Sequence, residues 1–584
     1  MIAIRFLIFS FILCTSAAWG QFTYQFDTLS IHERMMGNID SVDVRSASLP
    51  TTFDGGLEIM SQKGFSIARL NNDFGGLRFN GAASYDVNQF APKKQLKFSA
   101  LPFLGFAYSF GGQGTQFIRA EYVQAFTDSL VLNIDYAGNI GNGYLRRSTF
   151  VSSRVNMDLE WKSKWYTLQV SGNYFSDSLQ HNGGLLTDTL IETFGLIFSP
   201  VRKENAASAN KYGRFDLTNY FHFNPGKEQR IGVLTDHVYD LRYRAYHETD
   251  TLSGIYNQIN IDSTTTYDRY NLARIKNSAG AFYAHKNKYL DFRIGHTYWS
   301  NLNLGNDFDT TEIDIASNFR WNFGKIQLEN QFKQNILGGF GAMSERVRLI
   351  YHRLKWSVSG NLSIDRIAPT PMQRRYFGNN YSYQLTNFSL EDRLQIGGEV
   401  IYKIKGDSVF VGASVNSLSI RNAYLFTDSS WWAGIGALNA LQFGVYGQFQ
   451  VGKFHFHPRV IYSVANQEYL PVFQAYTRIY FKSAIFKAKK LVLLAGIDAS
   501  YISSFQPRTY IPSMDAYSWD STTEKTSGMV NAHFFTSIEI STFRFFVRYE
   551  NIGYFWNSKL LSEIKGYPIG SQRIRLGLTW SFFN

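Results

Sequence analysis

The chain ends in the stretch Gln572–Asn584, QRIRLGLTWSFFN, which decides its fold class. Successive side chains of a β-strand point to opposite faces, so as a strand this segment has two different sides. One face carries only apolar residues: Ile574, Leu576, Leu578, Trp580 and Phe582. The other face carries Arg573, Arg575, Gly577, Thr579 and Ser581. An apolar face that ends in aromatic residues, opposite a polar face, is typical of a strand in an outer-membrane β-barrel, with lipid on one side and a polar lumen on the other.

The other end of the chain favours export. The first twenty residues begin with the positive charge of Arg5, continue through an apolar run over 6–13 that is too short to span a bilayer, and end with small residues at Ala18 and Gly20. A lipoprotein leader cut before Cys14 is the alternative, but it usually requires a small preceding residue, and a leucine stands there. We predict that residues 1–20 are a cleaved signal peptide. An exported soluble β-protein is the remaining alternative to a barrel.

Cysteine usage and composition narrow the class further. Cys14 is the only cysteine, so the predicted mature chain has no disulfide, thiolate metal site or cysteine nucleophile. Mean hydropathy is −0.20, and no second apolar stretch approaches the ~20 residues of a membrane-spanning helix. Aromatic residues nevertheless make up 17% of the chain. Barrels place such residues in girdles at both membrane interfaces, whereas a soluble protein with this excess would expose large apolar patches.

The charge is basic but dispersed. The formal net charge is +12, and removal of Arg5 with the leader leaves +11. No block of Lys and Arg supports nucleic-acid binding. Basic residues instead recur at every second position, as in Arg242 and Arg244 or Arg573 and Arg575. We predict that they form a solvated polar face; anion preference in a pore is the alternative.

The organisation along the chain is strand, turn, strand. We expect residues 21–50 to form an N-terminal periplasmic tail and residues 51–584 to form the barrel. Short turns are predicted at Trp161–Trp165, Asn224–Lys227, Gly324-Lys325 and Gly452-Lys453. Longer polar stretches lie over 176–192, 247–267 and 515–527. Short turns at one end and long loops at the other are the barrel pattern, and at roughly 25 residues per strand we predict about 20 antiparallel strands, with an even number from about 16 to 26.

Several short segments carry a family resemblance. They are Leu101-Pro102-Phe103, Asn142-Gly143-Tyr144, Asn182-Gly183-Gly184, Tyr469-Leu470-Pro471, Gly566-Tyr567-Pro568-Ile569 and Arg575–Phe582. With them, the sequence from about Leu70 to its end resembles the porin-10 family of Bacteroidetes. The sequence departs from the family pattern at 140–144, where the family usually has Ser-x-Gly-x-Tyr. It also ends in Asn584, whereas many outer-membrane barrels end in an aromatic residue. The resemblance implies an outer-membrane barrel of porin type, with no shared catalytic or ligand residues.

Candidate sites are few. His455 and His457 lie two apart, so on a strand they face one side and could share a metal ion. No nearby carboxylate or third histidine completes such a site, and we predict that they line the lumen. The segment Gly111–Gly114 has the composition of a phosphate loop, but it joins two predicted strands and precedes no helix. No Gly-x-Ser-x-Gly, His-Glu-x-x-His or Walker motif is present, so we predict no enzyme and no catalytic, cofactor or metal residues.

A recurring tripeptide also has two interpretations. Asp followed by Ser or Thr and then Leu occurs at Asp27, Asp128, Asp177, Asp188 and Asp250. The pattern resembles a short O-glycosylation acceptor of exported Bacteroidetes proteins. Loop exits into strands that begin with Leu give the same pattern, and we favour that interpretation.

These features predict an all-β transmembrane antiparallel barrel of the outer-membrane type. The expected function is passive diffusion of small hydrophilic solutes through a polar lumen. The alternative is a loop-plugged barrel that acts in binding or transport with a partner protein; residues 21–50 are too short for a separate plug domain. Expected partners are outer-membrane lipid, the barrel assembly machinery and small hydrophilic solutes, with no nucleic acid and no cofactor. The sequence does not determine the oligomeric state.

Overall fold

The structure is a computed structural model. It describes Ser99 and residues 101–583, apart from short gaps at 188–189, 225–227, 250–255, 304–307, 339–340, 406–407, 428–431, 436, 467, 469, 487–489, 508, 520–523, 556–561 and 569–570. The predicted signal peptide, the predicted tail over 21–50 and the first part of the predicted barrel, 51–98, lie outside the described residues.

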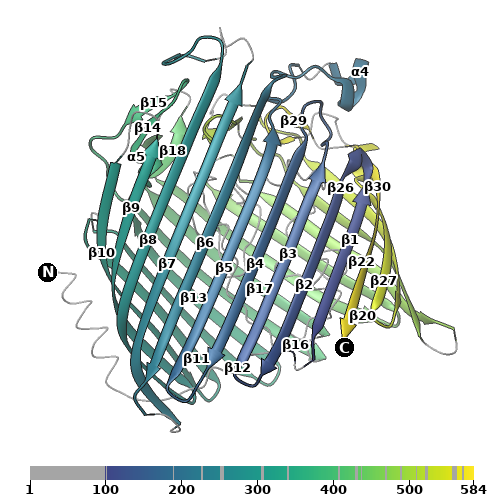
Figure 1. The fold of residues 1–584 in the computed structure, drawn as a ribbon. Coiled ribbons are helices and arrows are strands. Elements are labelled where there is room, and N and C mark those ends of the chain that lie inside the picture. The colour runs from purple at the N-terminus through teal and green to yellow at the C-terminus, as the bar shows by residue number, and fades with distance from the viewer. Residues whose placement is uncertain are drawn as a thin grey trace.

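One closed sheet of 22 strands forms the wall of a barrel (Figure 1). Each strand pairs antiparallel with the next, and β1 pairs with β30, so the wall has no unpaired edge. The wall strands are β1 (Phe103–Gly111), β2 (Gln116–Thr127), β3 (Leu130–Gly141), β4 (Phe150–Lys162), β5 (Tyr166–Gln180), β6 (Ala206–His222), β7 (Gln229–Glu248), β8 (Thr266–His285), β9 (Lys288–Asn303), β10 (Phe308–Phe323), β11 (Ile326–Leu337), β12 (Met343–Arg353), β13 (Trp356–Ile367), β16 (Glu391–Lys405), β17 (Val409–Arg421), β20 (Leu438–Val451), β21 (Phe454–Ala465), β22 (Phe473–Ile485), β23 (Leu491–Ile502), β26 (Met529–Ile540), β27 (Phe543–Glu550) and β30 (Arg573–Phe583). The prediction of an outer-membrane-type barrel with about 20 strands is confirmed.

Shorter elements occupy the connections between wall strands. They are η3 (Gly112–Gly114), α4 (Leu190–Phe198), α5 (Pro371–Arg374), β14 (Arg375–Phe377), β15 (Ser382–Gln384), β18 (Ala423–Thr427), β19 (Trp432–Ile435), β24 (Thr509–Ile511), β25 (Ala516–Trp519), η4 (Ile552–Phe555), β28 (Ser562–Ile564) and β29 (Tyr567–Pro568). None of the helices in the described ranges has the length and apolar character needed to cross a bilayer.

The last strand has the two faces that its sequence predicts. Ile574 and Trp580 point outward and are 56% and 45% exposed. Arg575 and Thr579 point inward and are 2% and 0% exposed. The alternation therefore separates a lipid-facing surface from a lumenal surface along β30.

The end of the barrel with short turns carries an aromatic girdle. The predicted turns at Gly324-Lys325 and Gly452-Lys453 join β10 to β11 and β20 to β21, and both glycines have the positive φ that tight hairpins need. Exposed aromatic residues ring this end: Trp161, Trp165, Phe221, Phe223, Phe323, Trp356, Phe454, Trp580 and Phe582. The ammonium of Lys288 lies 4.9 Å from the centroid of the Trp321 ring. Aromatic rings beside lysines mark a membrane interface, so one membrane surface lies near these turns.

The longer connections lie at the opposite end, which we call the loop end (Figure 1). The predicted polar stretches over 176–192, 247–267 and 515–527 all belong to it, although β5 continues to Gln180 and β8 begins at Thr266. The chain therefore alternates between tight turns on one side of the membrane and long loops on the other, as predicted.

Candidate functional site

The described parts of four connections at the loop end pack onto one another or onto the neighbouring connection, and we call them the lid: they lie within residues 368–390, 422–437, 503–528 and 551–572. Two of them share one small sheet, because β18 pairs with β19 and also, in parallel, with β25, which pairs with β24. The fourth packs against the connection between β5 and β6 through buried Tyr567 and Leu185. The lid is thus a packed structure and not a set of separate loops.

Asp515 joins the lid to the opposite wall of the barrel. It follows β23, the nineteenth wall strand, whereas Arg242 and Arg244 lie on β7, the seventh. Its Oδ2 is 3.6 Å from Nη1 of Arg244 and 3.9 Å from Nη2 of Arg242, and all three side chains are buried. Arg244 also donates a hydrogen bond to the carbonyl oxygen of Pro512. Because these strands lie about half way around the barrel from each other, the contact crosses the mouth.

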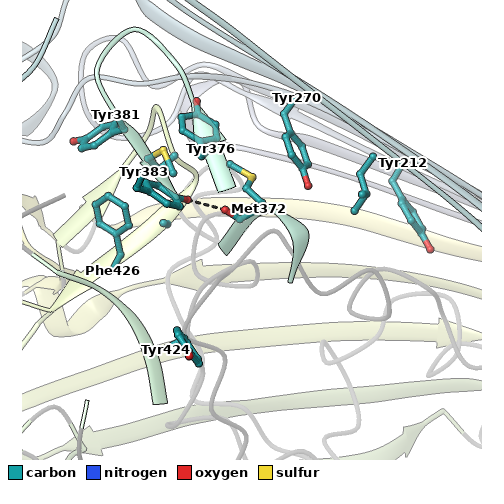
Figure 2. Close-up of a cluster of buried hydrophobic side chains, with 11 residues drawn as sticks. Tyr212, Tyr270, Met372, Tyr376, Tyr381, Tyr383, Tyr424 and Phe426 are labelled. Atoms are coloured by element: carbon teal, nitrogen blue, oxygen red, sulfur yellow. Dashed lines mark hydrogen bonds between the residues drawn. The ribbon is translucent and has the colours of Figure 1, made fainter. Parts of the chain in front are cut away.

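A tyrosine-rich cluster packs the lid against the wall (Figure 2). Its buried members are Tyr212, Tyr270, Leu272, Met372, Tyr376, Tyr381, Tyr383, Tyr424, Phe426, Met514 and Ala516. The hydroxyl of Tyr383 donates to the carbonyl oxygen of Met372 at 2.8 Å, and that of Tyr376 donates to Asp268 of β8 at 3.3 Å. Burial raises the pKa of Tyr381 to about 12, so its hydroxyl stays neutral near neutral pH. The cluster therefore fixes the connection 368–390 to strand β8.

Two segments that carry the family resemblance meet where the lid contacts the connection between β5 and β6. The backbone N–H of Leu185, just after Asn182-Gly183-Gly184, donates to the carbonyl oxygen of Gly566 at 2.8 Å. Asn182 in turn accepts from the N–H of Gly184 and donates to the carbonyl oxygen of Arg146. The bond from Leu185 holds the connection between β5 and β6 against the connection between β27 and β30, and the bond to Arg146 holds it against the connection between β3 and β4.

One part of the inner wall, over β22 to β30, contains a buried network of charges. Arg478 on β22 donates to Asp498 on β23 through Nη2 at 2.8 Å, and Arg548 lies 3.2 Å from the same carboxylate. Glu550 on β27 accepts from Nε of Arg573 at 2.7 Å and from Nε of Arg575 at 3.0 Å. Each of these six side chains is at most 10% exposed. This network ties together neighbouring strands inside the barrel.

The prediction that the alternating arginines form a solvated face is wrong. Arg242, Arg244, Arg573 and Arg575 are between 2% and 6% exposed. They do face the lumen, as the alternation predicts, but each lies close to a buried carboxylate. The spacing of arginines predicts which face they share and does not predict whether water reaches that face.

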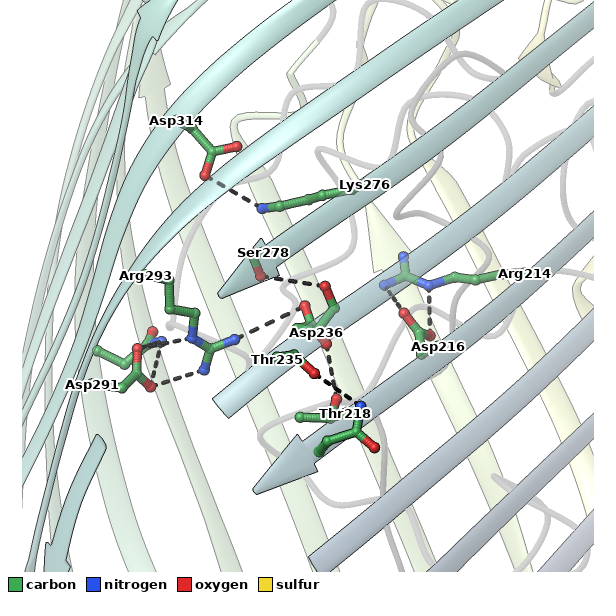
Figure 3. Close-up of polar contacts among 12 residues, drawn as sticks. Arg214, Asp216, Thr218, Thr235, Asp236, Lys276, Ser278, Asp291, Arg293 and Asp314 are labelled. Atoms are coloured by element: carbon green, nitrogen blue, oxygen red, sulfur yellow. Dashed lines mark hydrogen bonds and ion pairs between the residues drawn. The ribbon is translucent and has the colours of Figure 1, made fainter. Parts of the chain in front are cut away.

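The wall over β8 to β12 differs, because Lys333 and Arg346 on it are 42% and 46% exposed. Figure 3 shows several of the polar contacts on this side of the barrel. Arg293 on β9 pairs with Asp291 through two bonds of 2.9 and 2.8 Å. Lys276 on β8 donates to Asp314 on β10 at 3.5 Å. Lys333 on β11, which lies 3.6 Å from the other oxygen of Asp314, is 42% exposed. The charges of this wall are therefore more exposed than those of the network over β22 to β30.

The remaining candidates lie where a barrel would place them. His455 and His457 face inward on β21 and both contact the ring of Tyr480, the first stacked at 4.6 Å and the second edge-on at 5.5 Å. Within the described ranges no group of three or more His, Cys, Asp or Glu side chains is arranged to hold a metal ion. The segment Gly111–Gly114 closes the hairpin between β1 and β2, as predicted.

The recurring Asp-Ser/Thr-Leu pattern falls on more than one kind of structure. Asp128 lies in the turn between β2 and β3, whereas Asp177 is buried on β5 and accepts from the amide of Asn210 at 2.7 Å. Asp27, Asp188 and Asp250 lie outside the described residues. Asp128 fits the loop-exit interpretation, because β3 begins at Leu130, whereas Asp177 lies inside β5 and is neither a loop exit nor an accessible acceptor.

The architecture defines a class: an outer-membrane-type β-barrel whose loop end is covered by a packed lid. The chain belongs to the family described as "Putative porin", whose model matches residues 71–584. No curated protein matches its sequence.

Solved structures similar to this barrel share its fold at low sequence identity. A mutant of the ferric enterobactin receptor from Pseudomonas aeruginosa has a TM-score of 0.58 at 9% identity, covering 83% of this chain and 81% of that one. The ferric-catecholate import receptor Fiu from E. coli K12 has a TM-score of 0.58 at 10% identity, covering 83% and 82%. The FrpB iron transporter from Neisseria meningitidis has a TM-score of 0.57 at 9% identity, covering 83% and 82%. At these identities the likeness concerns the fold alone.

Proposed function

We propose that this chain acts in the outer membrane as a transport barrel for small hydrophilic solutes, with the lid controlling access from the loop end. The observation that carries the proposal is the contact of Asp515 with Arg242 and Arg244 across the mouth. Membership of a porin family and the barrel fold support the location and contact with outer-membrane lipid. Export by a signal peptide over 1–20, a periplasmic tail over 21–50 and insertion by the barrel assembly machinery belong to the same proposal. We propose no catalytic role.

The route through the barrel follows the wall over β8 to β12. Charged side chains there are partly exposed, whereas those over β22 to β30 are buried in ion pairs. A polar, water-lined wall lets a hydrophilic solute keep hydrogen-bond partners as it loses water. Solute entering from the loop end must first pass the lid, so movement of the lid sets the rate.

Passive diffusion through a permanently open channel is the second candidate. The description of the family as a porin and the polar lumenal wall favour it. The names of the similar structures, which are receptors and a transporter for iron compounds, favour controlled access instead, although they give no substrate for this chain. The two candidates differ in one respect: only controlled access depends on the contacts that hold the lid.

Swelling of liposomes that contain the protein, in solutions of sugars of graded size, tests the proposal. We expect slow swelling with the wild type and faster swelling with Asp515→Asn, which removes the charge that holds the lid to β7 while preserving the size of the side chain. Glu204→Gln is the matched control, because Glu204 pairs with Arg146 and Arg147 at the partly exposed rim. Fast swelling that is equal in all three proteins would favour the open channel, and no swelling in any of them would contradict solute transport.

A further inference from the structure

The wall over β8 to β12 contains a recess of about 290 Å³. Four cationic side chains line it, from strands β8, β9, β11 and β12, and its lining includes one carboxylate: Lys276, Arg293, Lys333, Arg346 and Asp314. Neutral hydrogen-bonding groups such as the amide of Asn318 also line it, together with the apolar side chains of Ala316 and Phe332. Every second residue of a strand faces the lumen, so inward-facing side chains of neighbouring strands lie side by side around the recess.

The cations in the recess differ in how they are paired. Arg293 is held from the side by Asp291 through two hydrogen bonds. Lys276 and Lys333, by contrast, share Asp314: one ammonium lies 3.5 Å from Oδ1 and the other 3.6 Å from Oδ2. Two ammonium groups therefore share the single carboxylate of Asp314, while a further carboxylate, Asp236, lies 4.0 Å from Arg293. Asp314 itself is only 2% exposed, so the cations form the outer surface of the recess.

The exposure of the cations makes them accessible from the lumen. The side chains of Lys333 and Arg346 are 42% and 46% exposed, and Arg346 lies 4.0 Å from Asp365. An anion that enters the recess can therefore contact Lys333 without displacing the buried Asp314. An anionic oxygen group is favoured over a neutral one here, because it gains Coulomb attraction to the ammonium group in addition to the hydrogen bond.

We propose that this recess binds a carboxylate or phosphate group of a small solute against the exposed ammonium group of Lys333, while Lys276, which shares Asp314 with it, adds positive charge to the same site. The proposal rests on the proposed transport function and names the chemical class of its solute. A recess of this size is just below the range of pockets that enclose a drug-sized ligand, so it holds the anionic group and a small body attached to it. Bound anions then pass along the wall in preference to cations.

The reaction rate of a single cysteine introduced into the recess tests the proposal directly. Gln331 lines it and is exposed, and a Cys14→Ser background leaves Gln331→Cys as the only thiol. The folded protein in detergent is labelled with an anionic and with a cationic methanethiosulfonate reagent, with and without inorganic phosphate or succinate. We expect the anionic reagent to react roughly tenfold faster than the cationic one, and we expect phosphate, succinate or both to slow it. The two probes distinguish a tetrahedral from a planar anionic group.

Two added substitutions make the result specific. Lys333→Gln and Lys276→Gln should each remove most of the protection and of the preference for the anionic reagent. Arg320→Gln should leave both unchanged, because it removes the same charge from the lumenal side of β10 but pairs with Glu329 outside the recess. Equal rates for both reagents with no protection by either anion, or no labelling of the folded protein, would overturn the anion site. Because the readout needs no conduction, the site and the proposed transport function can fail independently.

Discussion

Gly184 and Gly566 meet backbone to backbone where the lid contacts the connection between β5 and β6. A Cβ added to Gly184 would lie 2.9 Å from the carbonyl oxygen of Gly566, and the two residues have φ of +82° and +79°. Both conditions exclude ordinary side chains, because an L-residue is strained at positive φ and the space is already filled. The two glycines belong to separate segments of the sequence that carry the family resemblance, and the fold brings them together to hold the lid.

Gly184→Ala should loosen the lid. The strain is on the order of 1–3 kcal/mol, and the connection between β27 and β30 can relieve it only by moving away. Tryptic cleavage at Lys565, which lies in that connection, should therefore become faster in the folded protein. Gly172→Ala on β5 is the control, since nothing lies within 4 Å of its added Cβ. Equal cleavage rates in both variants would contradict a role for the glycine contact.

Asp498→Ala should destabilise the whole barrel. It leaves the buried guanidinium of Arg478 without the carboxylate that it contacts at 2.8 Å, and removing one partner of a buried pair costs about 3–5 kcal/mol. Urea unfolding, followed by the gel mobility of the folded barrel, measures the loss. Asp392→Ala breaks the exposed pair with Arg366 and should change stability by about 1 kcal/mol or less. A similar small effect at Asp498 would show that the buried network is not structural.

Leu578→Lys should impair insertion into lipid. Leu578 faces outward near the middle of β30, and a lysine on the lipid-facing side at the membrane centre costs about 2–4 kcal/mol. Gln331→Lys, on the exposed lumenal side of β11, is the control and should insert normally. The fraction of folded barrel after refolding into lipid vesicles tests the difference. Equal yields would place the outer face of β30 somewhere other than in lipid.

The turn at Asp262 should resist acid. The N–H groups of Thr264 and Thr265 and the hydroxyl of Thr264 donate to its carboxylate, with the Thr264 N–H the largest cause, and they lower the pKa of Asp262 to about 2. Because the folded pKa lies below the ordinary value, the stabilisation is present above about pH 4 and is lost as the pH falls through about 2.

Hydrogen–deuterium exchange over 256–265 checks this pH dependence. After correction for intrinsic rates, protection should be the same at about pH 7 and about pH 4. Asp262→Ala should exchange faster at both values, because the donors lose their acceptor. A wild-type turn that loses protection already at about pH 4 would contradict the lowered pKa.

Local sequence patterns predicted the barrel wall because strand alternation and hairpin turns depend only on residues close together in the sequence. Alternation assigns Ile574 and Arg575 to opposite faces without knowledge of the rest of the chain, and Gly452 with Lys453 predicts a hairpin turn between strands that are sequence neighbours. The closing pair, β1 with β30, joins segments far apart in the sequence and was not predicted, although closure leaves the wall without an unpaired edge.

The lid and the buried charges depend on contacts between distant parts of the chain. In the sequence Arg244 is one of several alternating arginines, and only the folded structure brings Asp515 to it from the other side of the mouth. The same holds for Lys276 and Lys333, which lie on non-adjacent strands and meet around Asp314. No spacing in a single sequence encodes such pairs. The helix α4 was also missed, because a short apolar run such as 190–198 suits a strand as well as a helix.

Single-channel recording in a planar lipid bilayer tests the central claim most directly. The account predicts brief and infrequent openings for the wild type and a much higher open probability for Asp515→Asn, with Glu204→Gln behaving like the wild type. A steady, large conductance in the wild type that Asp515→Asn leaves unchanged would contradict control of the barrel by its lid.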